Sequence, residues 1–222
     1  MKRTIKVTGT GKMSLKADTV RLSLELIDKD MEYEAVIRQT AAHSQEVREA
    51  FEKLGFEGTE LKTVSFRVDT EYEGYQDPED NAWKQRFTGY RAVHAMKVEF
   101  SRERDILGDV LTAVSRLSGK PEFHIEYTVK DTEAAKQELL KKAVQDSRRK
   151  AEIIAEAAYV ALGEILNIDY SFGETSFVVR PVNRIAEAKM ASGVSMEDSL
   201  DLDIEPEDIK VEDTVTVIWK IN

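Results

Sequence analysis

Cysteine is absent from the 222-residue sequence. A chain without cysteine forms no disulfide, offers no thiolate to a metal ion and has no cysteine nucleophile. Thiolate zinc proteins and cysteine-dependent enzymes are therefore excluded as functional classes. The absence leaves the redox compartment open, because such a chain tolerates both oxidising and reducing surroundings.

An excess of basic residues is also missing. The sequence holds 32 Lys and Arg against 42 Asp and Glu, so its formal net charge is −10. This balance opposes binding to nucleic acid and to anionic membrane surfaces. The opening residues, MKRTIKVTGTGK, contain no apolar stretch typical of an export signal, and no long apolar run follows. We therefore expect no nucleic-acid partner, no membrane span and a cytoplasmic location.

Residue combinations that mark catalytic sites are lacking too. His43, His94 and His124 fall on three different segments, and no serine lies in a GxSxG arrangement. Gly9 and Gly11 lack the third glycine of a dinucleotide-binding fingerprint, so we interpret them as points of close backbone approach or a bulge. We expect a protein that is not an enzyme and that binds no cofactor.

Three residues are candidates for a metal site. Glu122, His124 and Glu126 alternate along one segment, so in a strand their side chains point to the same face and could converge on a divalent cation. An ordinary exposed strand face has the same composition. Both interpretations stay open.

Acidic residues gather near the end of the chain, within residues 197–207. The spacing and central glycine of an EF-hand are absent, so we interpret the cluster as a solvated loop. Its members are Glu197, Asp198, Asp201, Asp203, Glu205 and Glu207.

Residues 131–162 form the longest segment with helical spacing. The segment has no internal Gly or Pro and is rich in Ala, Glu, Lys and Leu. Asp131 or Thr132 can cap its start, and Gly163 can supply the left-handed residue that ends it. Small residues repeat along one side, which permits close approach of another backbone. We expect this helix to lie across a sheet or against its counterpart in another subunit.

The remaining pattern alternates between strand and helix periods. It predicts an α+β fold of mostly antiparallel sheets packed by helices, in the order β-β-α-β-β-α-β-α-β-β. We expect a single domain over residues 1–222. Two lobes are an alternative, residues 1–130 and residues 131–222, the second with an irregular excursion over residues 174–207.

Two segments carry candidate partner contacts. Residues 73–87 read as a polar loop between two strands, with Tyr75 and Trp83 near its middle. These aromatic residues either cover their own hairpin or contact a partner subunit or ligand. Further along, Phe177, Val178 and Val179 could add a strand to the edge of a neighbouring sheet.

Four segments together resemble one family. They are IKVTGTG at Ile5–Gly11, GYRA at Gly89–Ala92, the run at Ser147–Ile168, and VEDTVTVIWKI at Val211–Ile221. In this order and spacing the chain resembles the bacterial SIMPL-domain proteins, which include periplasmic immunogenic proteins and oxidative-stress defence proteins. The resemblance implies an α+β protein that assembles into symmetric rings or higher oligomers. Many relatives are exported.

The leading functional hypothesis is a non-enzymatic, self-assembling protein that scaffolds or binds an unidentified protein partner, in a stress response. Two observations support this hypothesis: reactive residue combinations are lacking, and several segments are suited to subunit contacts. The alternative is a protein that binds a small molecule or a divalent metal. It depends on His124 and its neighbours and on Tyr75 and Trp83.

Overall fold

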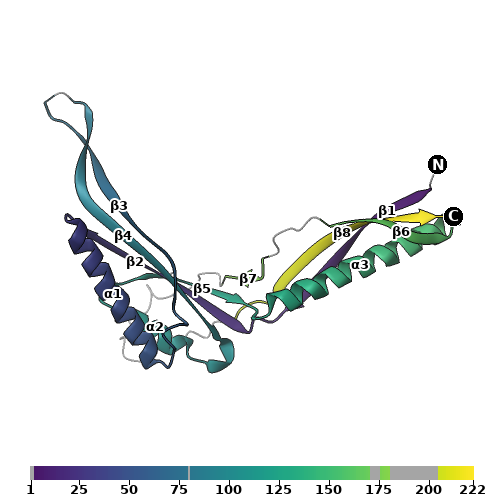
Figure 1. The fold of residues 1–222 in the computed structure, drawn as a ribbon, viewed down its shortest axis with the longest axis horizontal. Coiled ribbons are helices and arrows are strands. Elements are labelled where there is room, and N and C mark those ends of the chain that lie inside the picture. Colours follow the sequence, from purple (N-terminus) through teal and green to yellow (C-terminus); the bar gives the residue numbers. More distant parts are fainter. Residues whose placement is uncertain (1–2, 80, 171–175, 181–204) are drawn as a thin grey trace, which may run out of the picture. The chain divides into compact units, whose positions relative to one another are not determined.

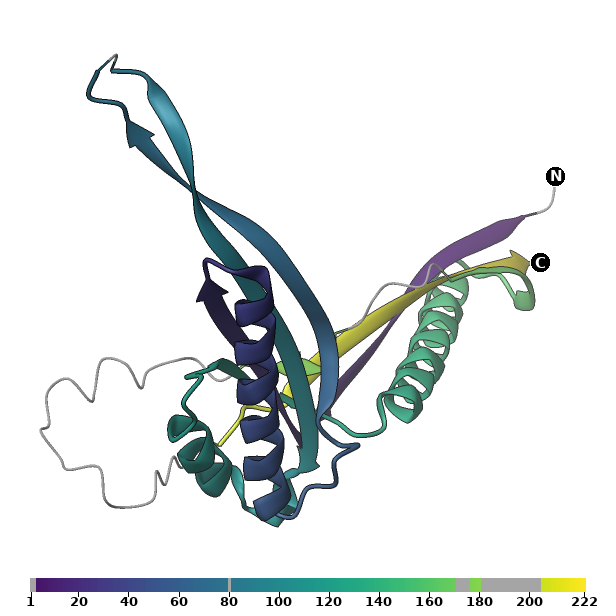
Figure 2. The same cartoon turned by 60° about the vertical axis from the view of Figure 1, so that its left-hand side comes forward.

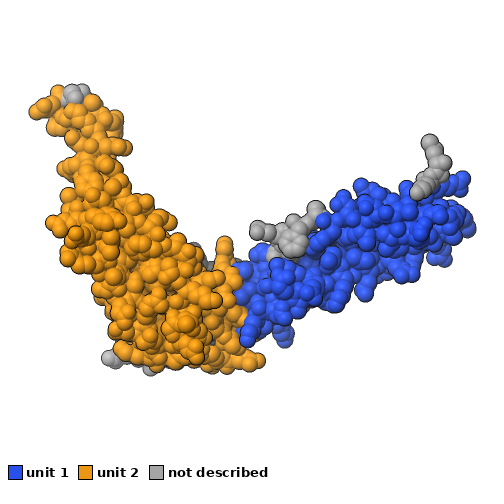
Figure 3. Space-filling model, viewed as in Figure 1, with its two compact units in different colours: residues 1–18, 127–179, 206–222 blue, residues 19–126, 180–205 orange. Residues whose placement is uncertain are grey.

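The computed structural model describes residues 3–79, 81–170, 176–180 and 205–222. It confirms an α+β fold, with helices packed on antiparallel sheets (Figures 1 and 2). The chain divides into two compact units, shown in blue and orange in Figure 3. The first unit comprises residues 1–18, 127–179 and 206–222, and the second comprises residues 19–126 and 180–205.

The first unit is a three-stranded antiparallel sheet with one long helix on it. Strands β1 (Thr4–Leu15), β8 (Ile209–Ile221) and β6 (Leu162–Asp169) lie in the order β1-β8-β6. Helix α3 (Thr132–Ala157) packs along β1 and β8 (Figure 1). Pairing of the first strand with the last brings the two ends of the sequence into one unit, which explains why its segments are discontinuous.

Gly9 and Gly11 of β1 lie directly against the backbone of α3. A Cβ atom on Gly9 would lie 2.0 Å from the Ala143 carbonyl oxygen, and one on Gly11 would lie 2.1 Å from the Leu139 carbonyl oxygen. Ala143 and Ser147, which belong to the small-residue side of α3, are fully buried there. The prediction of close backbone approach is confirmed, because the helix and strand touch without intervening side chains.

Helix α3 begins where the sequence predicts and ends earlier. The Asp131 carboxylate caps its start by accepting a hydrogen bond of 2.8 Å from the Ala134 amide. The expected end at Gly163 is wrong. Tyr159 adopts the left-handed conformation, with φ of 56°, and the Val160 amide donates to the Ala155 carbonyl in a Schellman closure. The helix therefore stops at Ala157, and Gly163 lies inside β6.

Tyr159 provides a test of this helix end. Its side chain is 97% exposed, so the left-handed backbone costs energy that no burial offsets. We expect Tyr159→Gly to raise the free energy of unfolding by about 1 kcal/mol, measured by urea denaturation. Tyr159→Ala keeps the strained conformation and should change it by less than about 0.5 kcal/mol. Equal effects of the two substitutions would contradict this account.

The second unit is a helix-packed antiparallel sheet. Its chain runs through β2 (Thr19–Asp30), α1 (Tyr33–Lys53), β3 (Lys62–Gln76), β4 (Trp83–Ser101), the 3-10 turn η1 (Arg102–Arg104), α2 (Leu107–Ser115) and β5 (Glu122–Thr128). The sheet order in this unit is β3-β4-β2-β5. The last two residues of β5, Tyr127 and Thr128, belong to the first unit, where they pair with β7 (Val178–Val179). Helix α1 packs on β2 and β4, and its C-cap residue Leu54 is followed by Gly55, whose φ is 82°. The predicted element order is confirmed, with the two-residue strand β7 added to it.

The β3–β4 hairpin is longer than the sequence suggests. The expected loop over residues 73–87 is wrong for most of its length, because β3 continues to Gln76 and β4 starts at Trp83. Cross-strand contacts hold this extension: Arg86 pairs with Glu73 at 3.1 Å, and the Tyr72 and Phe87 rings lie 5.7 Å apart. The outer part of the hairpin extends beyond α1 (Figures 1 and 2).

Part of the predicted excursion over residues 174–207 lies outside the described residues. Glu197, Asp198, Asp201 and Asp203 fall there, so the acidic-loop interpretation stays a prediction for them. Glu205 is described, and its carboxylate accepts a 3.1 Å hydrogen bond from the Arg102 guanidinium in an ion pair.

Candidate functional site

The proposed metal ligands lie along β5 without forming a cluster. Glu122 and His124 are exposed, whereas Glu126 is half-buried and is bound by two arginines. The Arg180 Nε atom lies 2.8 Å from the Glu126 carboxylate, and the Arg21 Nη1 atom lies 3.6 Å from it. Among the described residues, no group of three or more His, Asp or Glu side chains is placed to share a metal ion. The structure thus gives the metal alternative no support.

A buried hydrogen-bonded network joins α1 to the sheet of the second unit. The Ser44 hydroxyl lies 2.6 Å from His94 Nδ1, and the Thr63 hydroxyl lies 2.9 Å from His94 Nε2. His94 is 8% exposed and Ser44 is 9% exposed. Burial of the imidazole, with a smaller contribution from the Arg48 guanidinium, lowers the pKa of His94, which therefore stays neutral near pH 7. The sequence analysis separated His94 from the other histidines but did not indicate its hydrogen-bond partners.

A second buried pair lies nearby in the same unit. His43 Nδ1 is 2.7 Å from Asp28 Oδ1, and Asp28 is only 4% exposed. The other carboxylate oxygen, Oδ2, is buried and has no hydrogen-bond partner among the described residues. The pair ties α1 to β2. A serine, two histidines and an aspartate thus lie beside α1. Ser44 is hydrogen-bonded to His94, whereas Asp28 is hydrogen-bonded to the other histidine, His43. A Ser-His-Asp relay needs one histidine that contacts both other residues, and these four residues do not form one.

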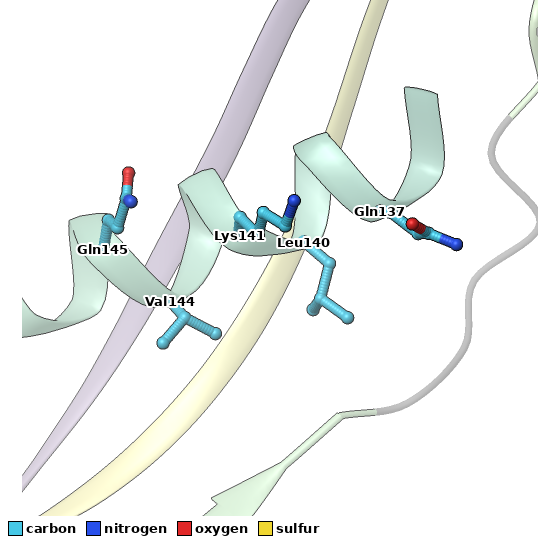
Figure 4. A pocket seen from close by; sticks show the side chains of 5 residues that line it. All are labelled: Gln137, Leu140, Lys141, Val144 and Gln145. Carbon is cyan, nitrogen blue, oxygen red and sulfur yellow. The ribbon is translucent and has the colours of Figure 1, made fainter. Parts of the chain in front are cut away.

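An open apolar groove follows one side of α3. It is lined by Gln137, Leu140, Lys141, Val144 and Gln145, at the spacing of successive helical turns (Figure 4). Val144 also packs against the core of the first unit. The groove has one charged side chain and no convergent polar groups, so it has little to orient a small molecule.

The hairpin end carries both aromatic candidates. Trp83 is 77% exposed and pairs with Gln76, while Tyr75 pairs with Lys84 and lies 5.9 Å from the Arg86 guanidinium. Because most of Trp83 is in solvent, it does not cover its own hairpin. This exposure favours a partner contact, which stays a prediction.

The candidates at residues 177–179 lie against the chain's own sheet. Phe177 is 4% exposed, and its carbonyl accepts a 2.8 Å hydrogen bond from the Thr128 hydroxyl. Val178 and Val179 form β7 beside the end of β5. Their pairing is thus internal in this structure, and pairing with a neighbouring chain stays a prediction.

The free edge of β1 is blocked by charged side chains of α3. The Asp146 carboxylate accepts a 2.9 Å hydrogen bond from the Thr10 amide, and Lys150 Nζ donates to the Thr8 carbonyl at 3.1 Å. The hydrogen bond from Lys150, followed by that from the Thr10 amide, lowers the pKa of Asp146 to about 2. An incoming strand would have to displace these ionic contacts, so this edge is protected.

The free edge of β3 has no such cover. Within the described residues, β4 is the strand that pairs with β3, and the opposite edge of β3 pairs with none. Val64, Phe66 and Tyr72 along β3 are 61%, 50% and 57% exposed. Strand β6 is a second uncovered edge, but it is shorter and is interrupted by two register shifts. A long edge strand with exposed apolar side chains is an interaction surface or an aggregation hazard.

These features define a cysteine-free α+β protein in which, within the described residues, the uncovered edge of β3 is the main candidate interaction surface. The chain belongs to the SIMPL family, described as a protein of unknown function (DUF541), whose model matches residues 5–219. It is 26% identical over 164 residues to proteins of Brucella melitensis and Brucella abortus, each named 26 kDa periplasmic immunogenic protein. The match covers 74% of this chain and 65% of each relative. The predicted resemblance is confirmed.

The expected cytoplasmic location is contradicted by these relatives, because both are named as periplasmic proteins. That expectation depended on the composition of the first residues alone. The absence of cysteine fits either compartment. None of the described helices is long and apolar enough to cross a membrane.

Proposed function

We propose that this chain is a non-enzymatic protein that assembles with copies of itself and whose surfaces hold a protein partner. The observation that carries the proposal is the uncovered edge of β3, a 15-residue strand. Backbone amide and carbonyl groups along such an edge are available to another strand. Natural proteins usually protect long edges, and side chains of α3 bind the edge of β1, whereas no described side chain is hydrogen-bonded across the regular edge of β3 between its two bulges.

The exposed apolar residues of the second unit support the same proposal. Val64, Phe66, Tyr72 and Trp83 lie along one hairpin with at least half of each side chain in solvent. Aromatic residues of this kind are enriched at protein interfaces. A monomer would leave all of them in water, whereas a partner that packs against the hairpin would reduce this exposure.

The non-enzymatic part of the proposal is supported by the fate of the polar residues. The buried Ser44 and the exposed Thr63 each form a hydrogen bond with the buried His94, and Glu126 forms ion pairs with arginines. The groove on α3 contains none of these groups. The described residues therefore bring no nucleophile and base together in an open pocket.

A periplasmic location is part of the proposal, supported by the names of the two relatives. A role in stress defence follows from the family resemblance alone and stays a prediction. Fractionation of the native host would test the location, and survival of a deletion strain under peroxide would test the role.

The proposal predicts a discrete oligomer in solution. Size-exclusion chromatography with light scattering should give a mass that is an integral multiple, two or more, of the 25.2 kDa chain. The measurement should be repeated at several protein concentrations in the micromolar range, because a weak association shows as an average mass that rises with concentration. A mass of one chain at every concentration would overturn the proposal.

A further inference from the structure

We propose that two copies of the chain join through β3, antiparallel, about a two-fold axis that passes through Val68. This inference deepens the proposed self-assembly and rests on it. The occupant of the free edge is a second copy of the same strand, and the two sheets become one continuous sheet. Three independent features of β3 support this arrangement.

The first feature is the position of the regular part of β3. Its register with β4 shifts between Thr63 and Ser65 and again between Glu71 and Tyr72. Bulges interrupt strand addition at both points, because they twist the edge away from a straight ladder. The uninterrupted stretch therefore runs from Ser65 to Glu71, and its central residue is Val68. A two-fold axis at Val68 uses all of this stretch in both copies.

The second feature is charge complementarity. Antiparallel pairing about Val68 places Arg67 of each copy opposite Asp69 of the other. Within one chain these two side chains already form a 3.2 Å ion pair, on the same face of the strand, and both are more than half exposed. Pairing would convert two separate ion pairs into a closed square of alternating charges. Opposite charges directly across an antiparallel pair are favourable, and like charges are not.

Other registers lack this match. A two-fold axis perpendicular to the sheet leaves the side chains of both copies on the same face of the joined sheet. Two residues can therefore lie opposite each other only if their sequence numbers differ by an even number. An axis through Asp69 places this carboxylate opposite Asp69 of the second chain. Shifting it to Thr70 sets Asp69 against Glu71, and shifting it to Arg67 sets two guanidinium groups together. Of the registers that pair Arg67 with an acid, the one about Val68 alone avoids a like-charged pair.

The third feature is the opposite face of the strand. Phe66 lies on the side of the sheet that carries His94, with the two rings 5.6 Å apart, and it is 50% exposed. Pairing about Val68 sets Phe66 of each copy beside Thr70 of the other, and sets the two Val68 side chains together. The half-exposed apolar side chains would then form a continuous strip.

A single cysteine tests the axis directly, because the natural chain has none. Side chains of directly opposed residues lie close enough for a disulfide in favourable pairs. Val68→Cys should form a disulfide-linked dimer under mild oxidation about 10-fold faster than Thr70→Cys. Thr70 lies on the same face of the same strand, but its cysteine would be roughly 13 Å from that of the second copy. Non-reducing gel electrophoresis measures both rates.

Charge reversal tests the register. Arg67→Asp should weaken association about 10- to 100-fold, because the two introduced carboxylates join the two of Asp69 and place four neighbouring negative charges at the dimer axis. Asp69→Arg should weaken association similarly, because it places four guanidinium groups there. The double variant with both substitutions restores the alternation and should return to within about threefold of the natural chain. Mass against concentration by light scattering gives the three association constants.

The outcomes separate this inference from the proposal on which it rests. An oligomer of the natural chain with equal crosslinking of the two cysteine variants, or with no rescue by the charge swap, overturns the β3 pairing and leaves self-assembly standing. A monomeric natural chain that also fails to crosslink at Val68 overturns both. Preferential crosslinking at Val68 together with charge-swap rescue supports both.

Discussion

Replacing Gly9 by alanine is expected to lower the free energy of unfolding by about 3 kcal/mol or more, which is a large share of a typical domain's stability. The added Cβ would lie 2.0 Å from the Ala143 carbonyl oxygen and 2.4 Å from the Ser147 amide nitrogen. Both atoms belong to the backbone of α3, so no side chain can rotate away to make room. The helix would have to lift from β1 along several turns.

A matched substitution shows whether the effect is specific. Gly74 also lies in a strand, β3, and a Cβ atom there would meet nothing within 4 Å. Gly74→Ala should therefore change the unfolding free energy by less than about 0.5 kcal/mol. Urea denaturation followed by circular dichroism measures both variants. Similar stabilities of the two alanine variants would show that α3 does not approach β1 closely.

Features with a local periodic signal could be predicted from the sequence. The alternation in β8 sets its limits at Ile209 and Ile221. The capping carboxylate of Asp131 marks the start of α3, and Gly55 marks the end of α1. Gly9 and Gly11 could be interpreted correctly because an alternating strand has few other uses for two glycines.

Features set by contacts distant in sequence could not be predicted. The strand ladder from Glu73 to Phe87 depends on cross-strand pairs, since its composition alone resembles a loop. The end of α3 depends on Tyr159, a residue type that rarely adopts positive φ. The hydrogen-bond partners of His94 come from two other elements, α1 and β3, and are 50 and 31 residues away in the sequence.

The candidate interaction surface shows the same limit. Tyr75 and Trp83 are visible in the sequence as aromatic residues in a polar segment, and both lie at the exposed end of the hairpin. The edge itself is not visible, because sequence alternation is the same in a central and an edge strand. Among the described residues, the sheet order distinguishes the edge strand β3 from the central strand β4, and contacts from Asp146 and Lys150 distinguish the blocked edge of β1.

The buried network around His94 gives the second large effect. We expect His94→Ala to lower the free energy of unfolding by about 3 kcal/mol, because it creates a cavity in the interior and removes the hydrogen bond between the imidazole and the buried Ser44 hydroxyl. His124→Ala is the matched control. His124 is an exposed histidine on β5, so its replacement should cost less than about 0.5 kcal/mol.

The pH dependence of stability separates this network from simple packing. Burial lowers the pKa of His94 below the ordinary 6.5, so below that pH the unfolded chain binds the proton more readily than the folded chain. The contribution of the neutral imidazole is fully present above pH 6.5 and declines as the pH falls toward the lowered pKa. Urea denaturation at pH 7.5 and pH 5.5 should show a loss of stability on acidification that is smaller in His94→Ala than in the natural chain. An equal loss in both would mean that His94 is protonated as easily in the folded state as in the unfolded state, which its burial between Ser44 and Thr63 opposes.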